Sequence, residues 1–285
     1  MKPSSVYFLD SLNGIIGAQN KIFKSYDGGS TWEEKNISGI TGNSGEYNKL
    51  FFVNYDIGWA LSYGYAVKTT DGGETWQSKL NTVALYGIHF SDSLNGWVAR
   101  GIKPYKTTDG GETWVEQTNF PVSGARDVFF IDRFKGFICR TNELYKSVDA
   151  GINWSLVAEV TNFAFGRFSN LSANLFLAGG PRSYQSTDSG ENWTEVVELR
   201  NKLVEFIRLS NVNEGFAVGW RGLILQYTDS VVSVRENNIN VPAKYYLYQN
   251  YPNPFNPSTK IKYTVPSVTL RQAQSDINVT LKVYD

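Results

Sequence analysis

The sequence predicts an all-β protein of the β-propeller class, and three observations support this prediction. A motif of aspartate, glycine and tryptophan occurs in five full copies, at intervals of 44, 38, 40 and 39 residues. Short apolar runs separated by polar turns surround each copy, without the helical spacing of three and four. Aromatic residues form 15% of the 285-residue chain, and 26 glycines accompany them. This composition favours short strands and tight turns.

Each repeat unit contains four apolar runs, which predict four short strands. In the second unit these are residues 50–53, residues 58–62, the run leading into Asp71, and residues 76–80. One such sheet cannot bury its faces alone, so it stacks on its neighbours around an axis, as in a propeller. Six units are visible, and their first runs begin at Val6, Leu50, Gly87, Asp127, Phe165 and Phe206.

The sixth unit is incomplete in the sequence. A faded copy of the motif surrounds Asp229 without a tryptophan, and VVSVRE from Val231 is the candidate for the fourth strand. We therefore expect a ring of six blades, or of seven if one unit is absent. In the second case closure is expected to be imperfect, because propellers depend on completing the ring.

The recurring motif is expected to be a structural turn rather than a catalytic centre. Its aspartate can accept hydrogen bonds from backbone N–H groups just downstream. The second glycine is present in every full copy, which indicates a positive φ that glycine adopts at little cost. The tryptophan is expected to pack beneath the turn. The residues given this structural role are Asp27, Gly29, Trp32, Asp71, Gly73, Trp76, Asp109, Gly111, Trp114, Asp149, Gly151, Trp154, Asp188, Gly190 and Trp193.

This motif resembles the Asp-box, or bacterial neuraminidase repeat. The whole unit, with GW at Gly58 and Gly96 and KTTDGGETW ending at Trp76 and Trp114, resembles the propellers of the photosystem II stability and assembly factor family. The resemblance covers about residues 5–230. It implies that the Asp-box turns lie on the face away from the ligand. It implies no single activity, because such propellers include glycosidases, binding proteins and assembly factors.

A change in composition after Val234 divides the chain. We expect a propeller over residues 1–234, a linker over residues 235–246 and a second unit over residues 247–285. Closely spaced prolines force extended backbone in the second unit, and two alternating runs then read as strands of a partial β-sandwich. These prolines are Pro252, Pro254, Pro257 and Pro266.

The segment NYPNPFNPSTKIKYTVP, which begins at Asn250, resembles the start of the type IX secretion sorting domain. The resemblance implies a secreted or cell-surface protein whose C-terminal tail meets the secretion machinery. The family's domain is longer than residues 247–285, and its members also carry an N-terminal export signal that this sequence lacks. We therefore expect the chain to be a fragment of a longer exported protein.

Charge and composition give no reason to expect nucleic acid, a membrane, a metal or a cofactor. Lys+Arg and Asp+Glu number 27 each, which gives no general reason to expect nucleic acid or an anionic membrane as a partner. No apolar stretch is long enough for membrane insertion. The single histidine, His89, and the single cysteine, Cys139, lie in apolar runs and are expected to be core residues. Neither metal-ligand spacing nor a phosphate loop occurs, so no metal and no cofactor are expected.

Four consecutive units place an arginine at the turn between their second and third strands. In an antiparallel blade this turn lies opposite the aspartate motif, so these arginines are expected to share one face. The predicted recognition arc for an acidic protein or glycan consists of Arg100, Arg140, Arg182 and Arg221, with Trp220 and Tyr63 as aromatic platforms. Solvated turn residues are the alternative that the sequence leaves open.

These features predict an exported, non-enzymatic propeller that binds a protein or polysaccharide at the cell surface. The alternative is a glycoside hydrolase, either sialidase-like or of another Asp-box type. That alternative would need two carboxylates about 5–10 Å apart across an axial pocket. The F/Y-R-I-P segment typical of sialidases is absent. A passive spacer within a larger adhesin is a third alternative.

Overall fold

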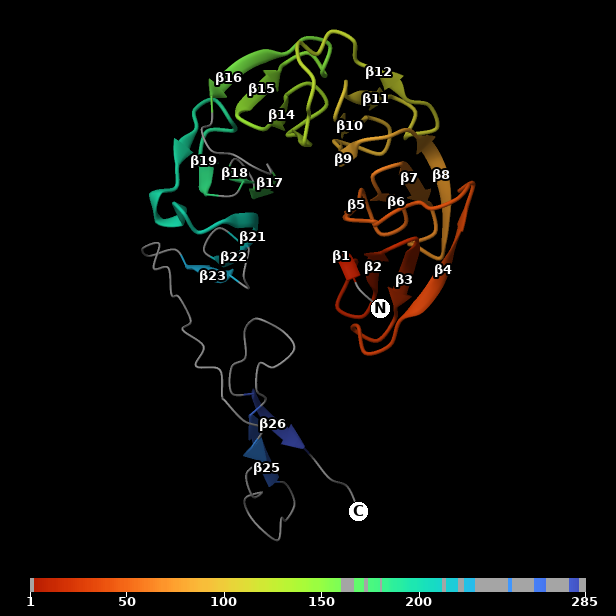
Figure 1. Cartoon of the computed structure of the whole chain (residues 1–285), viewed down its shortest axis with the longest axis vertical. Helices are drawn as coiled ribbons and strands as arrows, with labels where there is room; N and C mark the ends of the chain where they lie inside the picture. The colour runs from red at the N-terminus through yellow and green to blue at the C-terminus, as the bar shows by residue number, and fades with distance from the viewer. Residues whose placement is uncertain are drawn as a thin grey trace.

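The computed structural model describes residues 3–159, 167–171, 174–179, 181–211, 214–219, 223–228, 246–247, 259–264 and 277–281. Strands dominate this part of the chain, and the short 3-10 helix η1 (Val197–Leu199) is the exception. The strands of residues 3–228 form six blades that follow one another in an arc around a common centre (Figure 1). The protein is therefore all-β with the blade arrangement of a β-propeller, as the sequence predicts.

The strands of the six blades have the following bounds. Blade 1 contains β1 (Pro3–Phe8), β2 (Gly14–Ala18), β3 (Lys21–Ser25) and β4 (Glu33–Ser38). Blade 2 contains β5 (Lys49–Phe52), β6 (Gly58–Leu61), β7 (Tyr65–Thr69) and β8 (Thr75–Asn81). Blade 3 contains β9 (Leu85–Phe90), β10 (Gly96–Arg100), β11 (Tyr105–Thr107) and β12 (Val115–Glu116). Blade 4 contains β13 (Asp127–Phe130), β14 (Gly136–Arg140), β15 (Glu143–Ser147) and β16 (Ser155–Glu159). Blade 5 contains β17 (Arg167–Leu171), β18 (Asn174–Gly179), β19 (Arg182–Ser186) and β20 (Thr194–Glu195), and blade 6 contains β21 (Val204–Asn211), β22 (Glu214–Gly219) and β23 (Leu223–Thr228).

Within each blade the strands are antiparallel and lie in chain order. The first strand of each blade is innermost, and successive innermost strands from β1 to β21 contact one another around the axis. One departure joins blades 1 and 2 at the outer rim, where β4 pairs in parallel with β8 to give a single eight-stranded sheet. The predicted fourth strand of the sixth unit, from Val231, lies outside the described residues.

The blades share one register, so equivalent positions can be compared directly. In each full blade, the residue two positions before the motif aspartate pairs with a fixed position on the second strand. These pairs are Gly14 with Ser25, Gly58 with Thr69, Gly96 with Thr107, Gly136 with Ser147 and Leu175 with Ser186. The repeat seen in the sequence is thus a repeat of backbone pairing.

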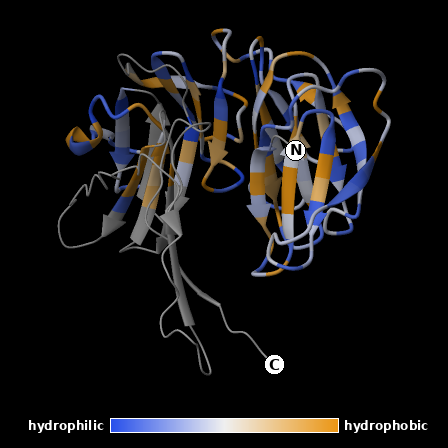
Figure 2. Cartoon of the chain, turned by 60° about the horizontal axis from the view of Figure 1, so that its bottom comes forward, coloured by the Kyte–Doolittle hydropathy of each residue, from blue (hydrophilic) through white to orange (hydrophobic). Residues whose placement is uncertain are grey.

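One position on the second strand fills the interface between neighbouring blades. On the second strands of blades 1 to 4, one residue follows the position that pairs with the third strand two residues before the motif aspartate. Its side chain is fully buried and lies against the second motif glycine of the next blade. The contacts are Ile15 with Gly73, Trp59 with Gly111, Trp97 with Gly151, and Phe137 with Gly190. Figure 2 shows how apolar residues concentrate on the strands of the blades. The core is therefore a series of layers between blades, which is how a propeller buries its sheets.

The two ends of the arc leave this interface uncovered. Phe216 in β22 corresponds to the buried aromatic residues of the other second strands, yet it is 49% exposed. At the other end Phe8 is 44% exposed, whereas its equivalents Phe52, Phe90 and Phe130 are buried. Figure 1 shows blades 1 and 6 lying apart at the two ends. The number of blades in a complete ring stays a prediction.

The C-terminal segment contributes one separate small sheet. Its strands are β24 (Tyr246–Leu247), β25 (Thr259–Thr264) and β26 (Ile277–Leu281), all antiparallel. The predicted boundary at residue 234 and nearly all of the linker 235–246 lie outside the described residues. The described part of the predicted partial sandwich is this three-stranded sheet.

The single histidine lies in the inner layer of the propeller. His89 packs between Phe51 and Phe129, with ring centroids 5.1 and 4.6 Å away. Its Nδ1 accepts a hydrogen bond from the Phe130 backbone N–H at 3.2 Å. Burial, together with the charge of Lys49, lowers the pKa of His89 from 6.5 to about 3. The ring is therefore neutral in the folded protein.

This lowered pKa predicts acid sensitivity that begins well above the pKa of the carboxylates. The unfolded chain binds a proton below about pH 6.5 while the folded chain does not, so stability falls as the pH falls from 6.5 toward 3. We expect the free energy of unfolding to drop by up to about 1.4 kcal/mol per pH unit in the range 6 to 5. Urea denaturation at several pH values measures this slope. His89→Asn keeps an acceptor near Nδ1 and should flatten the slope above pH 5; an unchanged slope would contradict the assignment.

Candidate ligand-binding face

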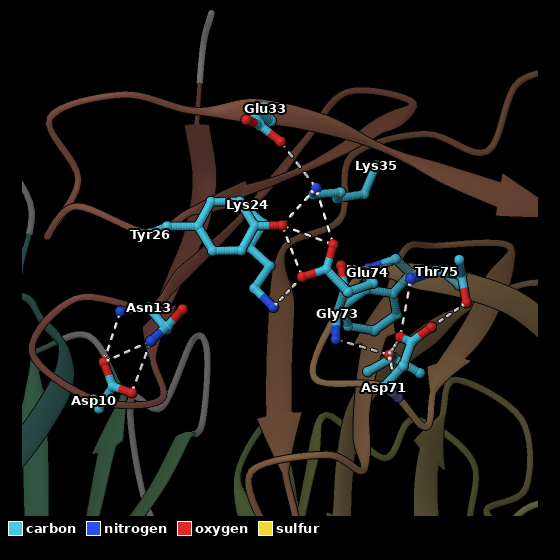
Figure 3. A network of polar contacts seen from close by, with 12 residues as sticks. Asp10, Asn13, Lys24, Tyr26, Glu33, Lys35, Asp71, Gly73, Glu74 and Thr75 are labelled. Atoms are coloured by element: carbon cyan, nitrogen blue, oxygen red, sulfur yellow. Dashed lines mark hydrogen bonds and ion pairs between the residues drawn. The ribbon is translucent and has the colours of Figure 1, made fainter.

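The five aspartate motifs form one type of turn between the third and fourth strands. In blade 2, Thr69 Oγ1 accepts from the Gly73 N–H at 2.9 Å and donates to Asp71 Oδ1 at 2.7 Å. The Asp71 carboxylate also accepts from the Thr75 N–H at 2.9 Å and the Thr75 hydroxyl at 2.6 Å (Figure 3). Trp76 is buried and donates its Nε1–H to the Gly73 carbonyl at 3.2 Å. We call this arrangement the DGG turn.

The carboxylate network recurs at Asp27, Asp109, Asp149 and Asp188. In the first turn, hydrogen bonds from the Thr31 hydroxyl, the Thr31 N–H and Ser25 lower the pKa of Asp27 from 3.8 to about 2. In all five turns the two residues after the aspartate have positive φ. The first of these is Ala150 in blade 4 and Ser189 in blade 5. Each second position is glycine and touches an aromatic ring or Ile15. These turns close the blades and join neighbours, and each aspartate carboxylate already accepts hydrogen bonds within its own turn.

Ion pairs on the same face also link neighbouring blades. Glu74, just after the second motif glycine, contacts Lys24 at 2.6 Å and Lys35 at 3.1 Å, both from blade 1 (Figure 3). Burial opposes ionisation of Glu74, but hydrogen bonds from Lys24, Tyr26 and Lys35 outweigh it and lower its pKa to about 2. The equivalent residues Glu112 and Glu191 pair with lysines of blades 2 and 4.

The interface between blades 3 and 4 breaks this pattern. Ile152 occupies the glutamate position and is 52% exposed. The lysine that faces it, Lys106, lies 5.7 Å from the Trp97 ring centroid, and burial lowers its pKa. Among the described residues, Lys106 makes no ion pair. This interface therefore lacks a contact that its neighbours have.

We expect Ile152→Glu to restore this ion pair. The pKa of Lys106 should rise, and the protein should gain up to about 1 kcal/mol of stability at low salt, as partly exposed pairs do. Thermal and urea denaturation measure the gain. Ile152→Gln is the control, because it removes the same apolar side chain without adding charge. Equal stability of the two variants at low salt would contradict the expectation.

The opposite face carries the predicted arginines, but Arg100 is not a free turn residue. The residue is 9% exposed, and its guanidinium lies 5.5 Å from the Tyr105 ring centroid. Nε donates to the Val83 carbonyl at 3.1 Å, and Nη1 lies 3.5 Å from Glu116 Oε2. Arg100 therefore holds blade 3 together and has limited capacity for a ligand.

The next two predicted arginines are also paired with carboxylates of their own blades. Arg140 ends β14 and contacts Glu143 at 2.6 Å, and Arg182 begins β19 and contacts Glu195 at 2.8 Å. Arg182 thus belongs to the third strand, at the position that Glu143 has in blade 4. The three arginines share a face but not a radius, in contrast to the expected arc. Trp220 and Arg221 lie outside the described residues.

An unpredicted arginine on this face lacks a carboxylate partner. Tyr63 is 54% exposed, and its ring meets Tyr86 edge-on at 6.0 Å. The Arg126 guanidinium lies 4.6 Å from the centroid of Tyr86. Its Nε is buried without a hydrogen-bond partner, and within the described ranges it has no ion pair. Arg140 Nε is also buried without a partner, so the feature that distinguishes Arg126 from the other arginines of this face is that no carboxylate of the described residues pairs with it.

Next to Arg126, the carboxylate of Asp127 connects four blades. Its oxygens lie 3.2 Å from Lys49 Nζ of blade 2, and Oδ2 accepts from the Phe168 N–H of blade 5 at 3.0 Å. Gly87 of blade 3 lies between Lys49 and Asp127. A Cβ at this position would lie 2.1 Å from Asp127 Oδ1. The glycine makes the long contact between Lys49 and Asp127 sterically feasible.

The strand register places a further cation, Arg167, at the position of blade 5 that is equivalent to Asp127 in blade 4. Lys49, Gly87, Asp127 and Arg167 occupy equivalent positions on β5, β9, β13 and β17. Arg167 is half-buried and precedes Phe168, whose N–H binds Asp127. In the part of the chain that the structure describes, Arg167 has no carboxylate within ion-pair distance. We call the group Lys49, Tyr86, Arg126, Asp127 and Arg167 the axial cluster.

The sequence contained a signal for the charged residues of the axial cluster. Comparing only the turns between the second and third strands did not reveal it. Arg126 and Arg167 stand at or just before the first apolar run of their units, one repeat apart. Aligning the units on their first strands instead of the turn after the second would have placed Lys49, Asp127 and Arg167 together. No sequence pattern reveals which arginine lacks a carboxylate, because the pairing glutamates lie on other strands.

Other chemistry has less support in the described residues. Three or more His, Cys, Asp or Glu side chains are nowhere grouped to hold a metal there. The described part also has no helix that is long and apolar enough to cross a membrane. Cys139 is buried, and burial raises its pKa. A groove of about 390 Å³ at the outer rim is lined by Lys68, Lys79 and Glu112, which already pair with one another.

Comparison with known proteins identifies the fold. No protein-family model matches the chain, and no curated protein matches it. Solved structures that resemble it are propellers. One is the GH74 enzyme of Niastella koreensis, with TM-score 0.59 and 15% identity over 92% of this chain and 50% of that chain. Another is PorZ, a surface component of the type-IX secretion system of Porphyromonas gingivalis, with TM-score 0.59 and 11% identity over 92% of this chain and 38% of that one.

A third structure, YCF48 bound to D1 peptide, has TM-score 0.43 and 18% identity over 80% of this chain and 95% of that chain. The chain thus spans half or less of the length of the first two proteins. At these identities the likeness shows the fold alone, and propellers of this kind include both enzymes and binding proteins.

Proposed function

We propose that this protein is a non-enzymatic binding propeller of the cell surface, which holds an acidic protein or glycan on the face opposite the DGG turns. The observation that carries the proposal is Arg126, whose guanidinium lies on the Tyr86 ring and has no ion pair among the described residues. Guanidinium groups bind carboxylates strongly and with defined geometry. The DGG turns, by contrast, use their carboxylates internally, which supports assigning the chain to the Asp-box propellers with a structural role for that motif.

The proposal includes export by the C-terminal segment. Residues 247–285 resemble a type IX sorting domain, and their described strands form a small separate sheet. In this account the tail meets the secretion machinery and the propeller reaches the cell surface. Expression in a host with that machinery tests this step. With the same N-terminal export signal fused to both, the full chain should reach the surface and a chain without residues 247–285 should not; equal surface amounts would contradict it.

A binding screen of the full chain tests the main proposal. Glycans and surface proteins are presented in parallel, and hydrolysis products are measured in the same samples. We expect at least one acidic ligand to bind in a salt-sensitive way without being cleaved. Cleavage of a bound glycan would favour the alternative, a glycoside hydrolase. Absence of binding to every acidic probe would contradict the proposal.

A further inference from the structure

We propose that the axial cluster is a binding site for uronate-containing polysaccharide. In this proposal uronate carboxylates of the polysaccharide pair with Arg126 and with Arg167, and a neighbouring sugar ring lies on Tyr63. This inference rests on the proposed binding function and names its ligand and site. The site differs from the arginine arc that the sequence suggested, since Arg100, Arg140 and Arg182 are already paired with Glu116, Glu143 and Glu195.

Charge at the axial cluster favours an anion. Lys49 and Asp127 neutralise each other across the start of blade 3. Arg126 adjoins Asp127 in the chain, and Arg167 adjoins Phe168, which binds the same carboxylate. Arg126 and Arg167 therefore both lie at or next to the start of an inner strand, on the face opposite the DGG turns, and neither has an ion pair among the described residues. Each guanidinium can donate two parallel N–H groups to a ligand carboxylate.

The cluster is also fixed in position before a ligand arrives. Asp127 is 1% exposed and is held by contacts from blades 2 and 5, which ties the starts of the inner strands together. Tyr86 covers one side of the Arg126 guanidinium. A site whose charged groups are already ordered loses less conformational entropy on binding.

Aromatic residues next to the cations favour a sugar over an acidic peptide. Tyr63 is exposed beside Tyr86 and offers an apolar ring with a hydroxyl group, a surface suited to the C–H face and hydroxyls of a sugar. An exposed tyrosine beside a second tyrosine that covers an arginine without an ion pair therefore matches a chain that alternates ring faces and carboxylates. An acidic peptide would need the charges but not the ring surface.

Calorimetric titration of the full chain with tetragalacturonate tests the proposal. Its fully methyl-esterified form is the neutral comparison, and hexaglutamate represents acidic peptides. The variants are Arg126→Gln, Arg167→Gln and Tyr63→Ala. The matched control is Arg133→Gln, because Arg133 also stacks on an aromatic ring, Phe134, but in the β13–β14 turn next to a DGG turn. Circular dichroism confirms that each variant folds, and Arg126→Lys replaces Arg126→Gln if the latter does not.

We expect tetragalacturonate to bind and its ester to bind at least about tenfold more weakly, as loss of a charged hydrogen bond implies. Each arginine variant should weaken binding by a similar factor, Tyr63→Ala should weaken it less, and Arg133→Gln should leave it unchanged. Equal affinity for acid and ester, or unchanged affinity in both arginine variants, would overturn the proposal. If hexaglutamate or a surface protein binds and tetragalacturonate does not, the uronate site fails while the proposed binding function survives. If nothing binds, both fail.

Discussion

Gly111→Ala is expected to destabilise the protein by about 3 kcal/mol or more. Gly111 has φ of 83°, and a left-handed conformation costs a residue with a Cβ about 1–2 kcal/mol. The added methyl group would lie 2.2 Å from Cζ2 of Trp59, which is fully buried in the interface between blades 2 and 3. Overpacking of that kind costs about 1–3 kcal/mol more. Urea denaturation monitored by tryptophan fluorescence measures the loss.

Gly72→Ala is the matched control for this substitution. Gly72 has φ of 68° at the first position of its DGG turn, where blade 4 already carries Ala150 at 64°. Its nearest neighbour for an added Cβ is the Tyr55 carbonyl at 3.3 Å, a tight but tolerable contact. This variant should lose only about 1 kcal/mol. Similar losses in the two variants would contradict the idea that packing between blades fixes the second glycine.

Asp127→Ala is expected to cost about 3–5 kcal/mol, because it leaves the partly buried ammonium of Lys49 without its partner. It also removes the acceptor of the Phe168 N–H, and a buried donor without a partner adds to the loss. The contacts broken link blades 2, 4 and 5, so unfolding should also become less cooperative. Chemical denaturation measures both effects.

Two further variants separate charge from hydrogen bonding at Asp127. Asp127→Asn keeps an acceptor for Phe168 and should lose less than Asp127→Ala. Adding Lys49→Met to Asp127→Asn removes the remaining charge and should recover part of the stability, as in other replaced buried pairs. A loss below about 1 kcal/mol for Asp127→Ala would show that solvent screens this pair and that it does not order the axis.

The sequence was sufficient to predict the blades because each local signal repeats. Every full unit places its Asp, second glycine and Trp at the same spacing, and the structure pairs the strands in the same register each time. The tight fit of the second glycine was only partly foreseen. A positive φ was expected from the sequence, whereas the contact with Trp59 or Phe137 of the preceding blade depends on how blades stack.

The sequence suggests a face for the candidate site, the one opposite the DGG turns, but it does not suggest the residues of the axial cluster. Antiparallel order alone puts the turn after the second strand opposite the DGG turn, which is why the sequence predicts one face for Tyr63 and Arg100. Whether an arginine is available depends on carboxylates that approach it from other strands. Glu116 and Glu195 lie 16 and 13 residues from the arginines they pair with. Arg126 lacks such a neighbour, and three-dimensional structure is needed to see this.

A crystal structure of the protein with tetragalacturonate tests the central claim most directly. The account predicts electron density for sugar carboxylates against Arg126 and against Arg167, with a pyranose ring over Tyr63. Density on the DGG-turn face, or an axial cluster left empty at saturating ligand, would contradict it.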